Sequence, residues 1–258
     1  APHAPYTVSD ESFTRVARLA AETGMPVHCH LHETAAEIAQ SEARFGRRPL
    51  RRLADLGLLG PELIAVHAVH MNDADLGLLA AHGASVAHCP HSNLKLASGI
   101  ARTARMRELG INVGIGTDGA ASNNRLDLIQ EARTAALLAK GTSGDATVWP
   151  AHEVLHAMTL GGARALGLGE QIGSIEPGKL ADLVAVDLSM LQTAPVFDPV
   201  SQLVYAAGRE QVSEVWVGGR AVVHKRQLAE TEVRSRVSEV VGRGRLWHNR
   251  IGEFLPDG

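Results

Sequence analysis

Short apolar runs alternate with segments of helical periodicity over residues 1–166, and this alternation limits the folds that the chain can adopt. It is typical of β/α units, which build a parallel sheet covered by helices. The expected strands span residues 25–30, 63–67, 84–88 and 112–117. The expected helices span residues 34–56, 73–82, 101–110, 124–140 and 151–166, after a first helix capped by Ser9 and closed by Gly24.

The sequence changes character after residue 166, where glycine-rich turns separate short β-prone stretches. Residues 167–226 are expected to form a small β subdomain, with a hairpin turn at Gly218 and Gly219. The charged stretch that follows predicts a C-terminal helical segment over residues 227–258. We therefore expect three parts, of which residues 1–166 contain the parallel sheet.

The composition is that of a folded protein, and it disfavours nucleic acid and membrane partners. Of the 258 residues 45% are hydrophobic, and 25 basic residues accompany 28 acidic ones without a long run of one sign. No apolar stretch approaches the ~20 residues of a membrane span. The two cysteines, Cys29 and Cys89, lack CxxC spacing, which fits a reducing cytoplasm. The 13 histidines are more than an ordinary domain contains and point to metal or acid–base chemistry.

Each of the four expected strands ends near a residue that can bind a metal or transfer a proton. These residues are His30, His67, His88 and Asp118. Taken singly, a histidine at a strand end is more often a hydrogen-bonded structural residue than a ligand. In β/α barrels, however, function gathers at the C-terminal ends of different strands, so four such endings in succession favour a shared site.

The segment HCHLHE places a metal ligand next to an acid. Strand alternation sends His28 and His30 to one face, and Glu33 follows just past the strand end. We expect His28, which lies two residues deeper, to be a core histidine. For His32 we expect a place near the site or in solvent.

Two loops offer further polar groups, each with a structural alternative. Asp118 lies in the glycine-rich run GIGTDGAASNN, where small neighbours leave room for a metal, water and substrate, although an Asp there could equally cap a helix. The loop over residues 89–99 is rich in small and polar residues. It could line a pocket, or Ser92 and Asn93 could form a tight turn with an Asx bond.

At this point the motifs support a family resemblance. The runs HCHLHE, IAVHAVH, HCPHSNLKLASGIA, IGTDGAASNN and SIEPGKLADLVAVD resemble consecutive landmarks of the methylthioadenosine/S-adenosylhomocysteine deaminases. These enzymes belong to the branch of the amidohydrolase superfamily that also contains triazine hydrolases and guanine deaminases. The resemblance extends over essentially the whole chain. The runs APHAPYTVS and GTDGAASNN are fairly specific to the adenosine-type branch, whereas TDG and GKLADLV mark only the superfamily.

The resemblance implies a hydrolase that deaminates an adenine nucleoside, namely 5′-methylthioadenosine, S-adenosylhomocysteine or adenosine, with one divalent metal, expected to be Zn²⁺. His30 and Asp118 would be the metal ligands, and His67 would lie beside the catalytic water. Glu33 would contact and protonate the purine, and His3 would contact the nucleoside. Zn²⁺ lowers the pKa of a bound water from 15.7 to about 7, so that Asp118 can take its proton.

The same resemblance implies a fold that this chain alone does not complete. It implies an α/β fold made of the C-terminal half of a (β/α)8 TIM barrel, with barrel strands five to eight in residues 1–166, plus part of a small β-sandwich. The family's HxH ligand pair lies on the first barrel strand, and the HCH and HLH pairs here already match the fifth-strand motif. We therefore expect the N-terminal half of the same protein as a partner, and a homo-oligomer.

Two other interpretations stay open. The protein could be a related guanine or triazine aminohydrolase, since these enzymes share the metal site. The chain could instead be an inactive half-barrel fragment, and we expect it to be inactive by itself. Comparing the turnover of methylthioadenosine with that of guanine distinguishes an adenine-nucleoside deaminase from the first alternative. An upstream strand with an HxH pair would argue against the second.

Overall fold

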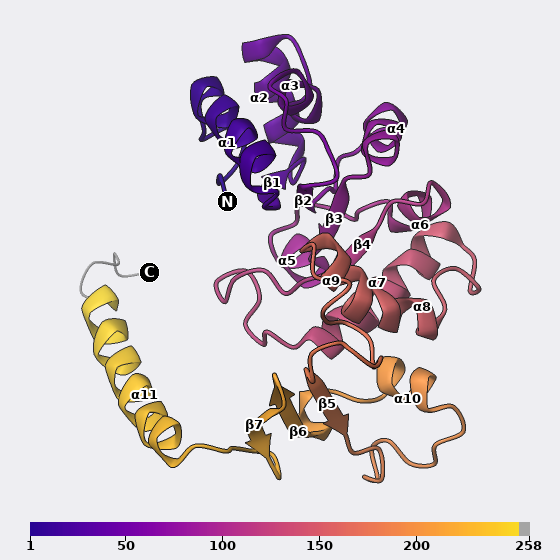
Figure 1. The fold of residues 1–258 in the computed structure, drawn as a ribbon, viewed down its shortest axis with the longest axis vertical. Helices are drawn as coiled ribbons and strands as arrows, with labels where there is room; N and C mark the ends of the chain where they lie inside the picture. The colour runs from indigo at the N-terminus through magenta and orange to yellow at the C-terminus, as the bar shows by residue number, and fades with distance from the viewer. Residues whose placement is uncertain (253–258) are drawn as a thin grey trace. The chain divides into compact units, whose positions relative to one another are not determined.

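The computed structural model describes residues 1–252, and within the last helix it describes only part of the side chains. The chain forms two compact units (Figure 1). The first comprises Ala1–Lys179 together with Leu188–Gln211, and the second comprises Leu180–Asp187 together with the chain from Val212 on. Among the described residues, no helix combines the length and the apolar character that a membrane crossing requires.

A four-stranded parallel sheet forms the centre of the first unit. Its strands are β1 (Val27–Leu31), β2 (Leu63–His67), β3 (Ser85–His88) and β4 (Val113–Ile115), paired in that order. The register places His30 opposite Val66, and Val66 opposite Ala87. Because all the pairings are parallel, the C-terminal ends of the strands meet at one edge of the sheet. The expectation of four parallel strands is confirmed.

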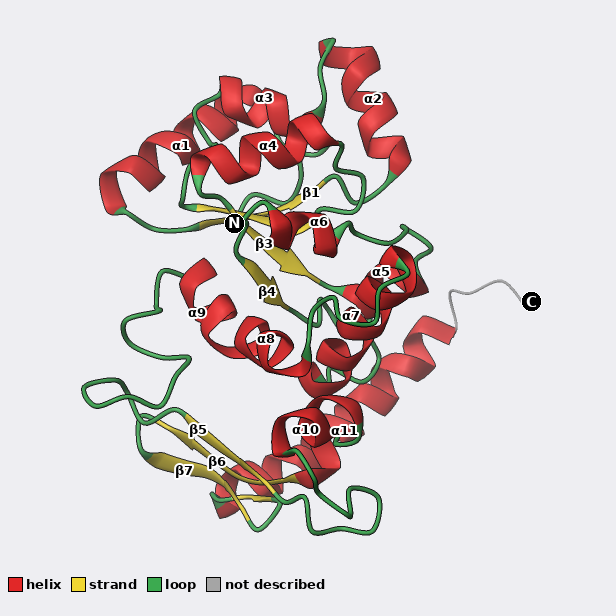
Figure 2. Ribbon diagram, turned by 90° about the vertical axis from the view of Figure 1, so that its right-hand side faces the viewer, coloured by secondary structure: helices red, strands yellow, loops and turns green. Residues whose placement is uncertain are grey.

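Helices separate and cover these strands (Figure 2). They are α1 (Asp10–Thr23), α2 (Ala35–Phe45), α3 (Pro49–Asp55), α4 (Asp73–His82), α5 (Pro90–Lys95), α6 (Thr103–Glu108), α7 (Leu128–Ser143), α8 (Ala151–His156), α9 (Gly162–Ala165) and α10 (Pro199–Tyr205), with a π-helical turn η1 (Ala157–Gly161) and a 3-10 turn η2 (Arg209–Gln211).

Local signals set several helix ends. At the start of α1 the Ser9 hydroxyl accepts a backbone hydrogen bond, and at its end Gly24 is left-handed, as predicted. The expected helix over 34–56 is two helices instead, because Gly46 adopts a φ of 67° and ends α2. The expected helix over 151–166 is interrupted by η1.

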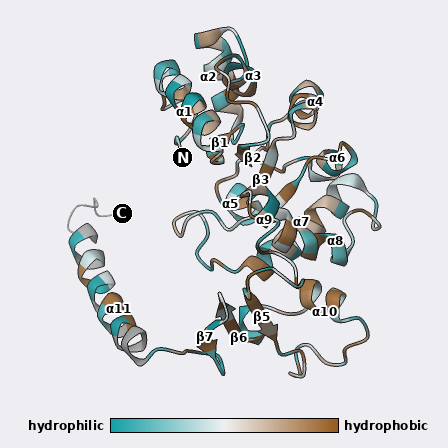
Figure 3. Cartoon of the chain, viewed as in Figure 1, coloured by the Kyte–Doolittle hydropathy of each residue, from teal (hydrophilic) through white to brown (hydrophobic). Residues whose placement is uncertain are grey.

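The hydrophobic core lies between the sheet and the helices that cover it. On β1, Val27, Cys29 and Leu31 are buried in this core, and the alternate residues His28 and His30 face the other way. His28 is exposed, so the prediction that it is a core histidine is wrong. In Figure 3, α1 and α7 both combine hydrophilic and hydrophobic residues, as expected of helices with one face on the core.

The second unit is an antiparallel sheet followed by a helix. Its strands are β5 (Leu183–Val186), β6 (Val212–Val217), β7 (Arg220–His224) and β8 (Gln227–Leu228), paired in that order, and its helix is α11 (Thr231–Gly252). The predicted turn at Gly218 and Gly219 joins β6 to β7, where both glycines have a positive φ. The predicted C-terminal helical segment extends to residue 258, and residues 253–258 lie outside the described residues.

The compact units divide the chain differently from the sequence pattern. Residues 188–211 fall within the predicted β subdomain 167–226, but they pack with the first unit. Val204 of α10 is buried in the core, and the guanidinium of Arg133 on α7 donates from Nε to the Val204 carbonyl at 3.1 Å. The sequence does not predict α10, because seven residues show too little periodicity.

Candidate functional site

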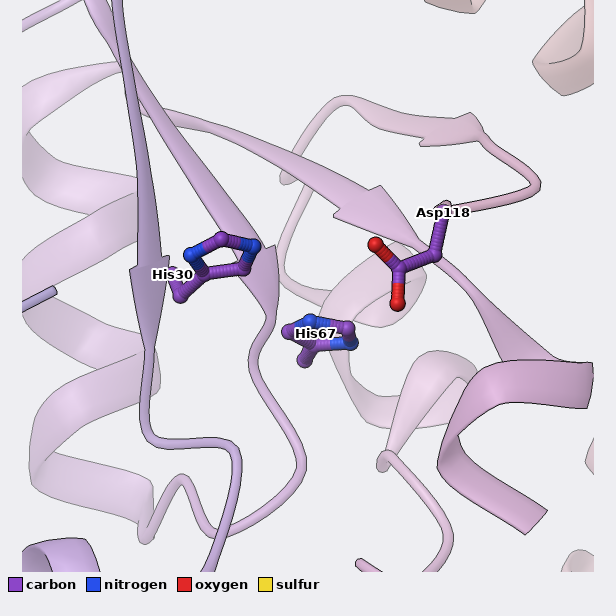
Figure 4. A group of neighbouring side chains, drawn as sticks. All are labelled: His30, His67 and Asp118. Atoms are coloured by element: carbon purple, nitrogen blue, oxygen red, sulfur yellow. The ribbon is translucent and has the colours of Figure 1, made fainter. Parts of the chain in front are cut away.

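Three side chains from different strand ends converge in the first unit (Figure 4). His30 comes from β1, His67 ends β2, and Asp118 lies in the loop after β4. One potential ligand atom from each lies within 4.8 Å of those of the other two. Two imidazole nitrogens and a carboxylate oxygen form a donor set that suits Zn²⁺ and related divalent ions.

The N-terminal segment is tied to β1 at His30. The carbonyl oxygen of His3 accepts the backbone N–H of His30 at 3.1 Å and lies 2.8 Å from its Nδ1. Because a carbonyl only accepts, Nδ1 of His30 carries the proton and Nε2 keeps its lone pair for a metal. The exposed His3 ring lies edge-on to the His30 ring, with centroids 5.0 Å apart, and its Nδ1 lies 2.8 Å from the Thr7 hydroxyl.

His67 is 1% exposed, and its backbone is left-handed, with a φ of 70°. Alternation would place it with its register partner Leu31 on the helix-covered face, yet its ring stacks on His30 with centroids 5.4 Å apart. Its Nδ1 lies 2.8 Å from Oδ1 of Asn93, a buried side chain on α5. Asn93 therefore orients His67. The sequence does not reveal this role, because Asn93 fits a tight turn equally well.

Two serine hydroxyls hold the Asp118 carboxylate. Ser92 on α5 donates to Oδ2 at 2.6 Å, and Ser122 donates to the same oxygen at 2.5 Å. Burial acts to raise the pKa of Asp118, but hydrogen bonds from Ser122, Ser92 and the Gly119 amide outweigh it and lower the pKa below its ordinary value. The residue that caps α7 is Asp127, so the alternative that Asp118 caps a helix is wrong.

Glu33 lies beside this cluster, with its Oε2 3.9 Å from Nε2 of His67. The Ser98 hydroxyl donates to the other oxygen of Glu33 at 3.3 Å. The turn that contains Glu33 is held by Glu37, whose carboxylate accepts the backbone N–H of His32 at 3.0 Å and that of Glu33 at 2.8 Å. The structure thus brings a carboxyl group from the β1–α2 turn next to the three potential ligands.

Two further histidines from the sequence motifs do not belong to the cluster. His88 ends β3, is 1% exposed and lies near Trp149, with ring centroids 6.4 Å apart. Burial lowers the pKa of His88 to about 4, and its Nδ1 has no hydrogen-bond partner among the described residues. His32 is fully buried and accepts the Leu50 amide on Nε2 at 3.0 Å, so of the two places expected for it, near the site or in solvent, the second is wrong. Of the four strand-end residues, His88 does not join the other three.

Donors of this kind at the C-terminal ends of a helix-covered parallel sheet define a class of hydrolases. The chain belongs to the amidohydrolase family, whose model matches residues 1–222. Within that family, a 5-methylthioadenosine/S-adenosylhomocysteine deaminase from Teredinibacter turnerae is 48% identical over 251 residues. The match covers 97% of this chain and 56% of that protein. The resemblance to these deaminases, in their C-terminal part, is therefore confirmed.

Solved structures agree with this assignment. An adenosine deaminase from Xanthomonas campestris with bound zinc is 52% identical, with a TM-score of 0.93 over 98% of this chain and 56% of that one. A mutant atrazine chlorohydrolase from Arthrobacter aurescens, complexed with zinc and atraton, is 26% identical, with a TM-score of 0.88 over 93% of this chain and 53% of that one. The chain thus spans about half the length of the proteins that it matches.

Proposed function

We propose that this chain is the C-terminal part of a metal-dependent hydrolase that deaminates an adenine nucleoside to the inosine analogue and ammonia. The substrate is 5′-methylthioadenosine, S-adenosylhomocysteine or adenosine. The proposal rests on the convergence of His30, His67 and Asp118, with Glu33 beside them. The identities of 48% and 52% to deaminases of this kind support the choice of reaction.

The donor set fits one divalent ion, and the zinc in similar structures favours Zn²⁺. His30 and Asp118 would hold the ion, with His67 at its side. When bound, Zn²⁺ supplies a water molecule acidic enough to act as a nucleophile at neutral pH. The hydrogen bond between Nδ1 of His30 and the His3 carbonyl fits this role, because it leaves Nε2 of His30 to bind the ion.

The protons would be moved by residues of this chain. Asp118, whose pKa is held low, is ionised at neutral pH and can accept a proton from the water that attacks C6. Glu33 can give a proton to the ring nitrogen next to C6. Asp118 then returns its proton to the amino group, which leaves as ammonia, while the hydroxyl group on C6 gives its proton to Glu33 and becomes the carbonyl oxygen of the inosine analogue. His67 would orient the water, and His3, at the exposed rim, would contact the nucleoside.

The site needs further ligands and the sheet needs further strands. A catalytic zinc usually has three protein ligands and one position for water, and only His30 and Asp118 are proposed here as ligands. We infer that the N-terminal half of the protein adds an HxH pair on a first strand, closes the four strands into an eight-stranded barrel, and completes a β-sandwich with the second unit. This inference is supported by the length of the related proteins, because the chain matches only about half of each.

A guanine or triazine aminohydrolase remains the alternative, since an atrazine chlorohydrolase shares the fold. Its 26% identity, against 52% for an adenosine deaminase, favours the adenine nucleoside. The complete protein, loaded with Zn²⁺, should be incubated in parallel with methylthioadenosine, S-adenosylhomocysteine, adenosine and guanine while ammonia release is measured. We expect an adenine nucleoside to have the highest kcat/KM. Turnover of guanine alone would overturn the substrate class, and no ammonia from any of these purines would overturn the reaction.

A further inference from the structure

The two serines that hold Asp118 come from different loops, and one buried carboxylate joins these loops. Ser92 follows β3, and Ser122 follows β4. The residues next to them, His91 and Asn123, both bind the side chain of Glu131 on α7. The backbone N–H of His91 donates to Oε2 of Glu131 at 3.1 Å, and Nδ2 of Asn123 donates to its Oε1 at 2.5 Å.

The Glu131 side chain is 1% exposed, so its charge is not solvated. A buried carboxylate is costly unless its oxygens are hydrogen bonded, and both oxygens here accept bonds from the two loops. Nδ1 of His91 also lies 2.8 Å from Oε1 of Glu131. Asn123 extends the link, because its Nδ2 also donates to the carbonyl of Thr117 at 2.9 Å, immediately before Asp118. The proposed reaction does not itself use Glu131.

These bonds set the positions from which both hydroxyls reach Oδ2 of Asp118. Unless both side-chain oxygens at position 131 accept these bonds, the loops after β3 and β4 lose their common anchor and can shift independently. The carboxylate that they hold would then be free to rotate. Groups that orient a metal ligand typically contribute about 10–100-fold to metal affinity or activity.

We propose that Glu131 is a positioning residue for the site, acting through Ser92 and Ser122 on the Asp118 carboxylate. It does not touch the reacting atoms. This inference rests on the proposed function where turnover is concerned, but Zn²⁺ binding reports on it independently. From the sequence alone, Glu131 looks like an ordinary polar residue of a helix.

The test compares Glu131→Gln with Asp127→Ala in the complete protein. Asp127 is also a buried carboxylate, 3% exposed, but it caps the same helix, where its Oδ1 accepts the amides of Ile129 and Gln130. We expect both variants to lower the melting temperature. Only Glu131→Gln should weaken Zn²⁺ binding, by about 10–100-fold in competition with a chromophoric chelator, and lower kcat more than it raises KM.

Combining Glu131→Gln with substitutions of the two serines tests whether Glu131 acts through them. In a protein that already carries Ser92→Ala and Ser122→Ala, Glu131→Gln should weaken Zn²⁺ binding little further, because the two hydroxyls through which Glu131 acts on Asp118 are already absent. Full additivity would overturn the proposal. So would equal losses of Zn²⁺ affinity in Glu131→Gln and Asp127→Ala, since fold stability would then explain them.

Failure of Glu131→Gln to fold and failure of the proposed function have different consequences for the proposal. If Glu131→Gln does not fold, Asn123→Ala cuts one of the two links, and unchanged Zn²⁺ affinity in that variant would overturn the proposal. If the wild-type protein deaminates no purine, the proposed function fails. The Zn²⁺ titrations then still decide whether Glu131 positions Asp118.

Discussion

Left-handed backbone conformation accompanies two of the three side chains that converge at the site. His67 and Asp118 have φ values of 70° and 59°, in the left-handed region that most residues avoid. At His67 this turn departs from strand alternation, and Asn93 holds the redirected ring. His88 has no such turn, and its side chain lies near Trp149 instead. Backbone strain of this kind costs about 1–3 kcal/mol per residue and is concentrated at functional sites.

Removal of either proposed ligand should remove the metal. In the complete protein, His30→Ala and Asp118→Ala each take away one of the converging donor atoms, so we expect loss of bound zinc and of deamination together. Elemental analysis of the purified variants measures the metal. His152→Ala, whose side chain is 74% exposed, serves as the control and should keep it. Stoichiometric zinc in both ligand variants would contradict the assignment.

Glu33→Gln should separate chemistry from metal binding. A neutral amide of the same shape cannot deliver a proton to the ring, and general acid–base groups typically contribute about 10²–10⁴-fold to the rate. We expect kcat to fall by that order while the zinc content stays unchanged. Glu42→Gln on α2, with a side chain 53% exposed, is the matched control. A decrease in kcat smaller than about tenfold would mean that Glu33 only orients other groups.

His88 should make the protein less stable in mild acid. Burial lowers its pKa from 6.5 to about 4, so below pH 6.5 the unfolded chain takes up a proton that the folded chain refuses. Stability is therefore lost as the pH falls from 6.5 towards 4, by up to about 3 kcal/mol for this one group. His88→Leu should flatten this decrease in urea unfolding measured between pH 7.5 and 5. An unchanged pH dependence would show that His88 does not contribute.

At the scale of elements, β4 and the helical segment after α8 approach so closely that glycine is required where they meet. A Cβ atom on Gly114 would lie 3.0 Å from Cα of Gly162, and backbone cannot move aside as a flexible side chain can. A Cβ atom on Gly161 would lie 3.0 Å from the carbonyl oxygen of Val113. Because the loop with Asp118 follows β4, this contact helps to set the position of the proposed ligand.

A matched pair of glycine substitutions tests this contact. Gly114→Ala should destabilise the protein by about 1–3 kcal/mol, the usual cost of overpacking. Gly141→Ala, in α7, places its Cβ atom where nothing lies within 4 Å, and should stabilise the protein by about 0.5–1 kcal/mol. Urea unfolding of the two variants measures both effects. Equal stability of Gly114→Ala and wild type would disprove the close packing.

At the scale of the whole molecule, the parallel sheet has two edges. Within residues 1–252, β1 pairs with β2 only and β4 pairs with β3 only. Unpaired edges present free backbone groups and favour association with other strands. The N-terminal half proposed above would cover both edges and add ligands to the site.

The chain by itself should therefore be inactive. Residues 1–258 expressed alone, with added Zn²⁺, should release no measurable ammonia from methylthioadenosine or adenosine, because only His30 and Asp118 of the described residues are proposed as ligands and a catalytic zinc usually has three. Coexpression with the N-terminal half should restore the activity. Substantial turnover by the purified chain alone would contradict the inference about the missing ligands.

Much of the framework could be predicted from local sequence patterns. The strand over 63–67 and the helix over 73–82 have the expected bounds, because hydrophobic periodicity and caps are read within a few residues. His30 and Asp118 were expected at strand ends and do converge with His67. The break of the helix over 34–56 is not predicted, although its signals are local, since Gly46 caps the end of α2 and Pro49 opens α3.

What the tertiary structure alone decided is the set of partners around these residues. Asn93, Ser92 and Ser122 reach His67 and Asp118 from loops that are distant in sequence or ambiguous in local pattern. The sequence by itself determined which residue types stand at the ends of the strands, since strand period and family motifs are local. Contacts between loops depend on how the whole sheet and its helices pack, and no local pattern encodes that packing.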